Sequence, residues 1–278
     1  MSEPILRALM QLFAIIAHPI SNAGERRKIV EYFLQRQINQ EAVKQYLAIY
    51  DHYYAIHQEK LKEKSKRKKR TASSSVRVLK ICTEINEELT QKQKNVVLVR
   101  LLEFIKSGGE ITEQEIAFVT TVADTFNIPD NEFDLIKSFV LNPFDELPHS
   151  KEILIIDSNE TVDIPNIKHI CSPNLNGEMR VIELDSVNMY FVRYIGKSEL
   201  YLNGQLLEQD KVYVLNVGAS IRSPKIQPIY YGDIISRFNI ERIKSRITFE
   251  AEDIAYTFSN GNIGLQPQSF SEESGKLI

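Results

Sequence analysis

The spacing of apolar residues changes near the middle of this chain, from a helical period of about 3.6 to an alternating period of about two. Before residue 143 the chain has three of its 11 glycines and long stretches with helical spacing. After residue 148 the apolar segments are short and alternate with polar residues. The stretch NPFDELPHS between them, with Pro143 and Pro148, is typical of a break between regular elements. We therefore predict an α+β chain with an all-α domain over residues 1–145.

The first half is expected to be a set of amphipathic helices. Its first helix has one apolar stripe that stops at His18-Pro19 and is formed by Ile5, Leu9, Leu12, Phe13 and Ile16. Further helices are expected to begin near Asn22 and to cover residues 40–66, 73–89, 92–106, 112–126 and 130–141.

A weak internal repeat relates residues 9–25 to residues 98–115. Each segment has an apolar helix, a short polar turn, an isoleucine, a capping residue and then a glutamate. Asn22 with Glu25, and Thr112 with Glu115, have the spacing of a capping box. Two related helix pairs that pack face to face would bury both apolar stripes.

The second half predicts an antiparallel β-sandwich over residues 146–245. Short alternating segments follow one another at intervals of roughly ten residues, and Asn203-Gly204 is a hairpin turn signal. Because no strand alternates with a long helix, a Rossmann-like sheet is excluded here. Strands are expected over residues 152–157, 179–184, 189–194, 199–207, 211–215, 219–222 and 233–240.

The sequence contains no catalytic motif. The five histidines have no metal-ligand spacing, and no GxSxG turn supplies a nucleophile. Ser274-Gly-Lys276 resembles the end of a phosphate-binding Walker A loop, but Phe270 stands at the first glycine position of that motif and Leu277 follows the lysine. We therefore expect no enzymatic activity and no cofactor in this chain.

Composition and the chain start predict a cytosolic protein. The chain has 34 basic and 37 acidic residues, and no apolar run approaches the ~20 residues that cross a bilayer. Glu3 stands where a signal peptide would have positive charge. The two cysteines, Cys82 and Cys171, lie far apart without CxxC spacing, which excludes a disulfide scaffold and a structural zinc site. We expect both to be small buried apolar residues.

A strongly basic run precedes the sequence TASSS. It is either the solvated end of a helix, a contact with an anionic membrane surface, or a contact with nucleic acid. Nucleic acid has the least support, because the net charge of the chain is −3 and the run has no interleaved aromatic residues. The cations of this basic run are Lys60, Lys62, Lys64, Lys66, Arg67, Lys68, Lys69 and Arg70.

Residues 247–278 resemble the opening strands of an ABC-transporter nucleotide-binding domain. The shared pattern is a strand, an aromatic residue, a short turn, a leucine and then SF…GKLI. The resemblance implies that Phe258 corresponds to the aromatic residue that stacks on adenine. It also implies that residues 246–278 are the first strands of such a domain, truncated before Walker A, and that a longer parent binds ATP and Mg. The alternative is an ordinary β-hairpin in which Phe258 is a packing residue.

Residues 5–141, with the repeated polar turn and glutamate, resemble the TerB-like helical family of tellurite resistance. In other members that turn has an Asp-Gly pair and acidic residues implicated in metal binding. Here the turns read HPISN and SGGEIT, without the aspartates. The resemblance leaves Glu25 and Glu115 as weak candidates for a metal site, and their capping role explains them without a metal.

Residues 150–240 resemble a degenerate FHA-like β-sandwich through the stretch ELYLNGQLL…VYVLNVGASIR. That family recognises phosphothreonine through a Gly-Arg loop, a Ser-x-x-His and an asparagine near a turn. Met189 stands in place of the histidine, and no Gly-Arg pair lies upstream. The resemblance therefore implies protein binding without phosphate, through loops that contain Ser186, Asn188, Asn203 and Gly204.

Together the resemblances imply the cytosolic N-terminal regulatory and protein-interaction region of an ABC transporter ATP-binding protein. Its parent would couple ATP hydrolysis to export, which would bring this region to the inner face of the membrane, and its partners would be proteins or the rest of the transporter. The alternative is a free-standing stress-response adaptor with TerB-like and FHA-like domains. A third hypothesis is a metal sensor that uses Glu25 and Glu115.

Overall fold

The computed structural model describes residues 3–17, 23–36, 38–64, 71–160, 167–239 and 248–273. The chain forms two compact units, residues 1–231 and residues 232–278. The expected boundary between residues 145 and 146 falls inside the first unit, where the helices give way to strands.

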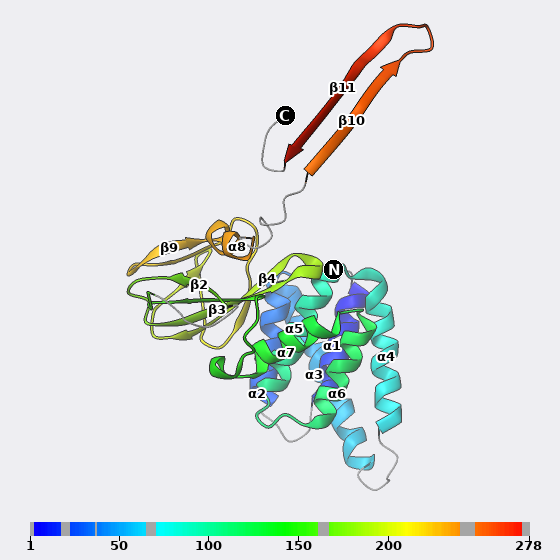
Figure 1. Cartoon of the computed structure of the whole chain (residues 1–278). Helices are drawn as coiled ribbons and strands as arrows, with labels where there is room; N and C mark the ends of the chain where they lie inside the picture. Colours follow the sequence, from blue (N-terminus) through cyan, green and yellow to red (C-terminus); the bar gives the residue numbers. More distant parts are fainter. Residues whose placement is uncertain are drawn as a thin grey trace. The chain divides into compact units, whose positions relative to one another are not determined.

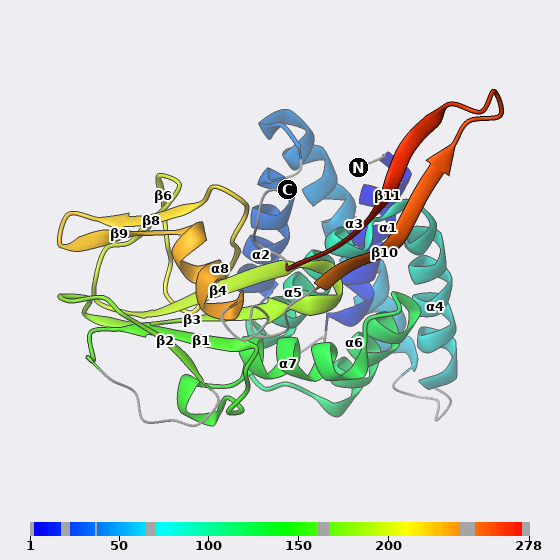
Figure 2. The ribbon, with the colours of Figure 1, turned by 45° about the horizontal axis from the view of Figure 1, so that its top comes forward.

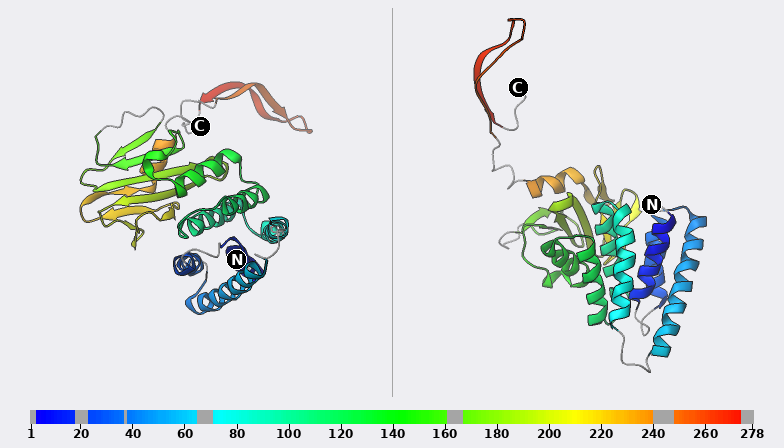
Figure 3. Two further views of the ribbon diagram at one scale, coloured as in Figure 1. Left: turned by 90° about the horizontal axis from the view of Figure 1, so that it is seen from below. Right: turned by 90° about the vertical axis from the view of Figure 1, so that its right-hand side faces the viewer.

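The helical part of the first unit is a bundle of helices that pack side by side, as Figure 1 and the right-hand view of Figure 3 show. All the helices expected in this half are present, with bounds close to the predicted ones. They are α1 (Glu3–Ile16), α2 (Ala23–Gln35), α3 (Gln40–Lys64), α4 (Thr71–Glu88), α5 (Gln91–Lys106), α6 (Glu113–Thr125) and α7 (Asp130–Leu141).

Helix α1 lies at the centre of this bundle and contacts α3, α4 and α5. Ten of its 14 residues are buried, among them Leu6, Met10 and Ile15, which lie outside the expected single stripe. A helix with so wide an apolar surface is stable only when other elements cover that surface. The sequence MQLFAII therefore packs α1 against several helices, while Glu3 and Arg7 remain exposed.

Local capping interactions begin two of these helices. Thr112 and Glu115 form the predicted capping box at the start of α6, with the Thr112 side chain accepting from the Glu115 backbone and Glu115 accepting from the Thr112 backbone. Thr90 and Gln93 form a second box at α5, which was not predicted. The predicted box of Asn22 with Glu25 cannot be assigned, because Asn22 lies outside the described residues.

The β part of the first unit contains two sheets, whose strands lie one layer above the other in Figure 2. The larger has the order β2-β1-β3-β4-β7, and the smaller has the order β6-β5-β8-β9. The larger sheet consists of β1 (Ile153–Asp157), β2 (Lys168–Cys171), β3 (Gly177–Leu184), β4 (Met189–Gly196) and β7 (Val212–Val214). The smaller consists of β5 (Tyr201–Leu202), β6 (Gln205–Leu206), β8 (Ser220–Ser223) and β9 (Ile226–Tyr230).

The expectation of a wholly antiparallel sandwich needs correction. Strand β1 pairs in parallel with β2, and neither β2 nor β9 was predicted. Of the predicted strand over residues 233–240, residues 233–239 belong instead to helix α8 (Tyr231–Asn239), which lies in the second unit from Gly232 on. Ile234 and Phe238, its buried residues, are four positions apart, which is helical spacing. Such short apolar runs fit either element when read from sequence alone.

Asn203 and Gly204 form the predicted hairpin turn between β5 and β6. Their φ angles are 51° and 84°, and both central residues of a type I′ turn require positive φ. The turn therefore selects an asparagine followed by a glycine.

The helices and the larger sheet share one apolar core. Buried Phe104 and Phe139 of the bundle belong to the same cluster as Ile182, Phe191 and Val212 of the sheet. Because neither part has a separate core at this junction, we expect the first unit to unfold as one body.

The second unit contains α8 and a two-stranded antiparallel hairpin of β10 (Thr248–Thr257) and β11 (Ile263–Glu273). Phe258 follows β10 directly, and its backbone N–H donates to Asn262 O at 2.8 Å. The Phe258 ring meets the Tyr256 ring edge-on, with centroids 5.0 Å apart. This geometry fits both expectations for the segment, the ordinary hairpin and the opening strands of a larger domain.

Candidate functional site

Two of the four predicted partner-binding residues line one groove of about 530 Å³ in the first unit. Asn188 precedes β4 and Asn203 lies in the β5–β6 turn, yet both face this groove. Ser186 is engaged elsewhere, because its backbone N–H and its hydroxyl donate to the Glu132 carboxylate on α7 at 2.8 and 2.6 Å. Gly204 is not among the lining residues. The structure therefore brings together Asn188 and Asn203 only.

The groove lies between helices and strands that are far apart in sequence. Helices α2 and α5 supply one side, and the residues around β4, β5 and β7 supply the other. Apolar side chains such as Phe33, Val96 and Leu215 alternate in its lining with polar ones. A pocket of this size and mixed lining is typical of ligand sites, which span ~300–1,000 Å³.

Both asparagines use their side-chain oxygen to hold the local backbone. Asn188 Oδ1 accepts from the Tyr190 hydroxyl at 3.2 Å, and Asn203 Oδ1 accepts from the Ser220 backbone N–H at 2.9 Å. Both residues have positive φ, 48° and 51°, which asparagine tolerates better than most residues. Among the residues that the structure describes, neither Nδ2 group has a hydrogen-bond partner, so each remains a donor at the groove.

Three cations line the groove, namely Arg36, Lys92 and Arg100, and no carboxylate does. Arg36 and Lys92 are exposed. The Arg36 guanidinium donates to the neutral Gln205 Oε1 at 2.7 Å and lies 4.9 Å from the centroid of the Tyr32 ring. Neither contact neutralises the charge, so the rim of the groove is positive. The sequence alone does not single out Arg36 and Lys92, because they approach the asparagines only in the folded chain.

Arg100 is buried and is neutralised within the protein. It pairs with Glu103 one turn along α5 and donates to Val212 O at 2.9 Å. Glu103 accepts from the backbone N–H of the same residue, Val212, at 2.8 Å. The Arg100 and Glu103 side chains thus bind both the C=O and the N–H of Val212 on the outer edge of β7.

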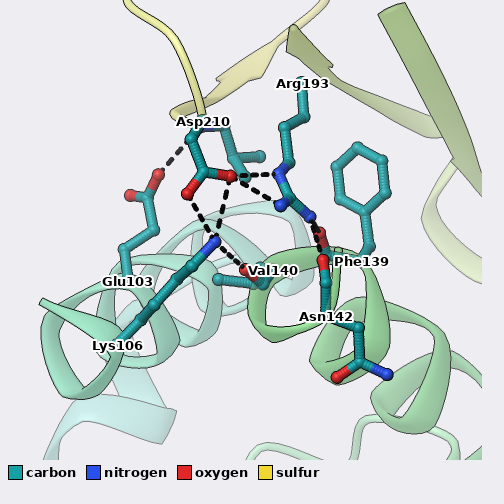
Figure 4. Close-up of polar contacts among 8 residues, drawn as sticks. Glu103, Lys106, Phe139, Val140, Asn142, Arg193 and Asp210 are labelled. Carbon is teal, nitrogen blue, oxygen red and sulfur yellow. Dashed lines mark hydrogen bonds and ion pairs between the residues drawn. The ribbon is translucent and has the colours of Figure 1, made fainter. Parts of the chain in front are cut away.

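A second polar cluster, drawn in Figure 4, joins the helices to the sheet next to the groove. Arg193 of β4 and Lys106 of α5 both bind Asp210, with Arg193 Nε 2.7 Å from Oδ1 and Lys106 Nζ 2.8 Å from Oδ2. Arg193 also donates to the backbone carbonyls of Phe139 and Asn142 at the end of α7, and Lys106 donates to that of Val140 at 2.9 Å. We call this cluster the Asp210 clamp.

Burial lowers the pKa of Lys106, although the hydrogen bond to Asp210 acts in the opposite direction. Burial alone would raise the pKa of Asp210, but Lys106 and Arg193 outweigh it and lower that pKa. The clamp therefore consists of charged groups that are paired, and its chemistry is structural. Arg193 was visible in sequence as a charge inside the apolar strand MYFVRY, and a charge in such a position needs a partner.

The comparison with protein families identifies the helical part. Residues 8–138 match the family model described as tellurite resistance protein TerB. They form a TerB domain. No curated protein and no solved structure is significantly similar to the chain. The match covers the helical part of the chain, so the FHA-like and ABC resemblances stay expectations.

The two glutamates suggested as metal candidates lie on different helices of the TerB domain. Glu25 pairs with Lys28 at 2.7 Å at an exposed position of α2. Glu115 is buried and pairs with Arg26 at 2.5 Å, besides capping α6. Within the described ranges, no group of three or more His, Cys, Asp or Glu residues is arranged to hold a metal ion. Both carboxylates are therefore engaged by cations of the protein itself.

The buried pair of Arg26 and Glu115 joins the first turns of α2 and α6. Arg26 also lies over the Phe104 ring, 5.2 Å from its centroid. Gly108 makes room for it, because a Cβ atom at this glycine would lie 2.0 Å from Arg26 Nη2. The buried guanidinium thus explains why the first glycine of the SGGEIT turn, Gly108, has no side chain.

The remaining predicted residues are not among those that line the groove, or they lie outside the described residues. In the basic run, residues 66–70 lie outside the described residues, and nothing is described of the side chains of Lys60, Lys62 and Lys64. Phe258 in the second unit is half-exposed, at 51%. Of the helices described, none combines the length and hydropathy needed to cross a membrane.

The expectation of two buried cysteines was half wrong. Cys82 is buried in α4, and burial raises the pKa of its thiol to about 12. Cys171 is exposed, because it ends β2, the edge strand of the larger sheet. An edge strand has a neighbour on one side only, so its last residue has fewer groups to cover it.

Proposed function

We propose that this chain is a non-catalytic protein-interaction and regulatory region. The observation that carries this proposal is the groove, where two loop asparagines, two exposed cations and apolar side chains meet on a body held together by the Asp210 clamp. A rigid body with a groove of this kind can present one fixed surface to a partner. The groove lining contains neither a histidine nor a carboxylate, the groups most often used for general acid and base catalysis.

The proposed parent is an ATP-binding protein of an ABC transporter, in which Mg and the phosphates of ATP bind outside these residues. The hairpin of the second unit supports this, because several of its larger apolar side chains are exposed, with Ile254 at 38%, Tyr256 at 56%, Phe258 at 51% and Ile263 at 66%. A two-stranded hairpin alone is marginally stable in water. Further strands of an ATPase domain would cover these side chains, and Phe258 would be available to stack on adenine. The region would then act at the inner face of the membrane.

The reading frame after codon 278 tests the parent. A frame that continues with GxxxxGK[S/T] within about a dozen residues supports it, since that motif wraps the phosphates of ATP. A stop codon contradicts it. The present chain should also show no heat of ATP binding in calorimetry, and micromolar affinity would contradict its non-catalytic role.

The second candidate is a free-standing adaptor of the tellurite-stress type. The TerB domain favours it, because residues 8–138 match a family whose description concerns tellurite resistance. In this case the hairpin is an additional element, and both parts of the first unit bind proteins. A stop codon at position 279 would favour this candidate over the transporter.

The membrane location has a separate test through the basic run. The chain should sediment with vesicles that contain phosphatidylserine and not with neutral ones, since each cation adds about 1 kcal/mol near an anionic surface. Replacing Lys68 and Lys69 by glutamine should weaken sedimentation, whereas Lys44→Gln, an exposed site on α3, should not. Equal sedimentation of all three proteins would show that the run is only a solvated segment.

A further inference from the structure

The outer edge of β7 is closed at one end and open at the other. Leu215 N donates to Tyr190 O at 2.9 Å, and the ladder pairs Val192 with Tyr213. In an antiparallel ladder, alternate residues turn both backbone groups toward the partner strand. The N–H and C=O groups of Val212 and Val214 therefore point away from β4, at the edge of the sheet.

Helix α5 occupies one of these two positions. At Val212 the N–H donates to Glu103 and the C=O accepts from Arg100, so side chains take the place of a neighbouring strand. At Val214, two residues further, the outward groups have no hydrogen-bond partner among the described residues. Val214 lines the groove together with Val96 and Lys92, which are on the α5 turns that precede Arg100. The groove thus borders the strand edge at Val214, whose outward groups are unpaired among the described residues.

Unpaired strand edges bind extended peptides by adding a strand, with main-chain hydrogen bonds for affinity and side-chain pockets for specificity. Here the specificity would come from charge. Arg36 and Lys92 are exposed cations without an ion-pair partner in the described part of the chain, and the lining has no carboxylate to compete for them. The Nδ2 groups of Asn188 and Asn203 add two neutral donors. Donors of this kind favour an acidic side chain.

We propose that the groove binds a short extended segment of a partner protein, which adds to β7 at Val214 and places an Asp or Glu side chain against Arg36 and Lys92. This proposal deepens the interaction role proposed above and rests on it. The volume of about 530 Å³ suits a segment of a few residues, since an extended chain advances about 3.3 Å per residue. Apolar residues of the segment would contact Phe33, Val96 and Leu215.

Selection from a library of random heptapeptides displayed on phage, with the full chain as target, tests the proposal. Enriched peptides should share an Asp or Glu at one position. Their affinity, measured by fluorescence polarisation, should fall several-fold when salt is raised, because part of it is electrostatic. Arg36→Gln and Lys92→Gln should each weaken binding several-fold, and Lys44→Gln should leave it unchanged.

The strand addition has its own matched pair of variants. Val214→Pro removes the outward N–H, and proline is tolerated at edge strands when that N–H faces away from the sheet. Val214→Ala removes the same side chain and keeps the N–H. We expect about fivefold or greater loss of affinity for the proline variant and little for alanine, since an uncharged main-chain hydrogen bond contributes about 1 kcal/mol, which is about fivefold in affinity, and the register depends on it. If Val214→Pro does not fold, the selected peptide is N-methylated at one residue at a time instead. Methylation at every second residue should abolish binding.

Four results would overturn the proposal. The first is that no peptide is enriched, and the second is that the enriched peptides lack an acidic residue. The third is that the proline and alanine variants bind equally and N-methylation of the peptide has no effect. The fourth is that a peptide binds only when it is phosphorylated. None of them bears on the reading frame after codon 278. Conversely, a stop codon there would contradict the transporter parent and leave the groove proposal intact.

Discussion

Replacement of Arg193 by methionine probes whether the Asp210 clamp holds the helices to the sheet. The side chain of Arg193 is 2% exposed and binds Asp210, Phe139 O and Asn142 O. Methionine fills similar space but donates no hydrogen bond, so both carbonyls at the end of α7 lose their charged donor. Asp210 keeps Lys106 and is 46% exposed, and its share of the loss is therefore small.

The expected loss can be worked from the two carbonyls alone. Hydrogen bonds to a charged group contribute about 1.5–3 kcal/mol each, so two of them give about 3–6 kcal/mol. Burial of the methionine side chain returns about 1 kcal/mol or more. We therefore expect the free energy of unfolding to fall by about 2–5 kcal/mol, which is a large part of the 5–15 kcal/mol typical of a domain.

Chemical denaturation followed by far-UV circular dichroism and by tyrosine fluorescence measures this loss, since the chain has 12 tyrosines and no tryptophan. Arg7→Met is the matched control. Arg7 makes an exposed pair with Glu3 at 3.5 Å, and such pairs contribute about 0–1 kcal/mol. If Arg193→Met costs no more than Arg7→Met, the clamp does not join the two parts. Separate transitions for helical and β signals in the unaltered chain would refute the shared core.

Three further predictions concern the TerB domain and the effect of pH. Gly108→Ala should destabilise by about 1–3 kcal/mol, because its Cβ would collide with Arg26, whereas Gly24→Ala, with open space around it, should be neutral or slightly stabilising in thermal melts. The pKa of Asp210 is lowered below its ordinary 3.8, so the stability that Asp210 contributes is present above that value and lost as pH falls through the acid range. Asp210→Asn should therefore lower the free energy of unfolding less at about pH 3 than at neutral pH. An equal loss at both pH values would contradict this. Calcium, zinc or a chelator should leave the melting temperature unchanged, since Glu115 is occupied by Arg26; a rise with either metal would revive the metal-sensor hypothesis.

Much of the fold was predictable because its signals are local. Helix bounds follow from apolar spacing and from caps such as Thr112 with Glu115, and the β5–β6 turn follows from Asn203-Gly204, the residues that adopt positive φ most easily. Of the site, the sequence predicted Asn188 and Asn203. It could not predict that Ser186 binds Glu132 instead, because these residues are 54 positions apart and their contact depends on how α7 meets the sheet.

The sequence by itself determined the change from helices to strands, most of the elements, and the turn residues, since each depends on interactions within a few positions along the chain. The tertiary structure decided the parallel pairing of β1 with β2, the helical state of residues 231–239, and the groove itself. The reason is physical. Strand partners, buried ion pairs and groove walls join distant residues, some of them more than a hundred positions apart, such as Glu103 with Val212. Only packing of the whole first unit brings them within hydrogen-bond distance.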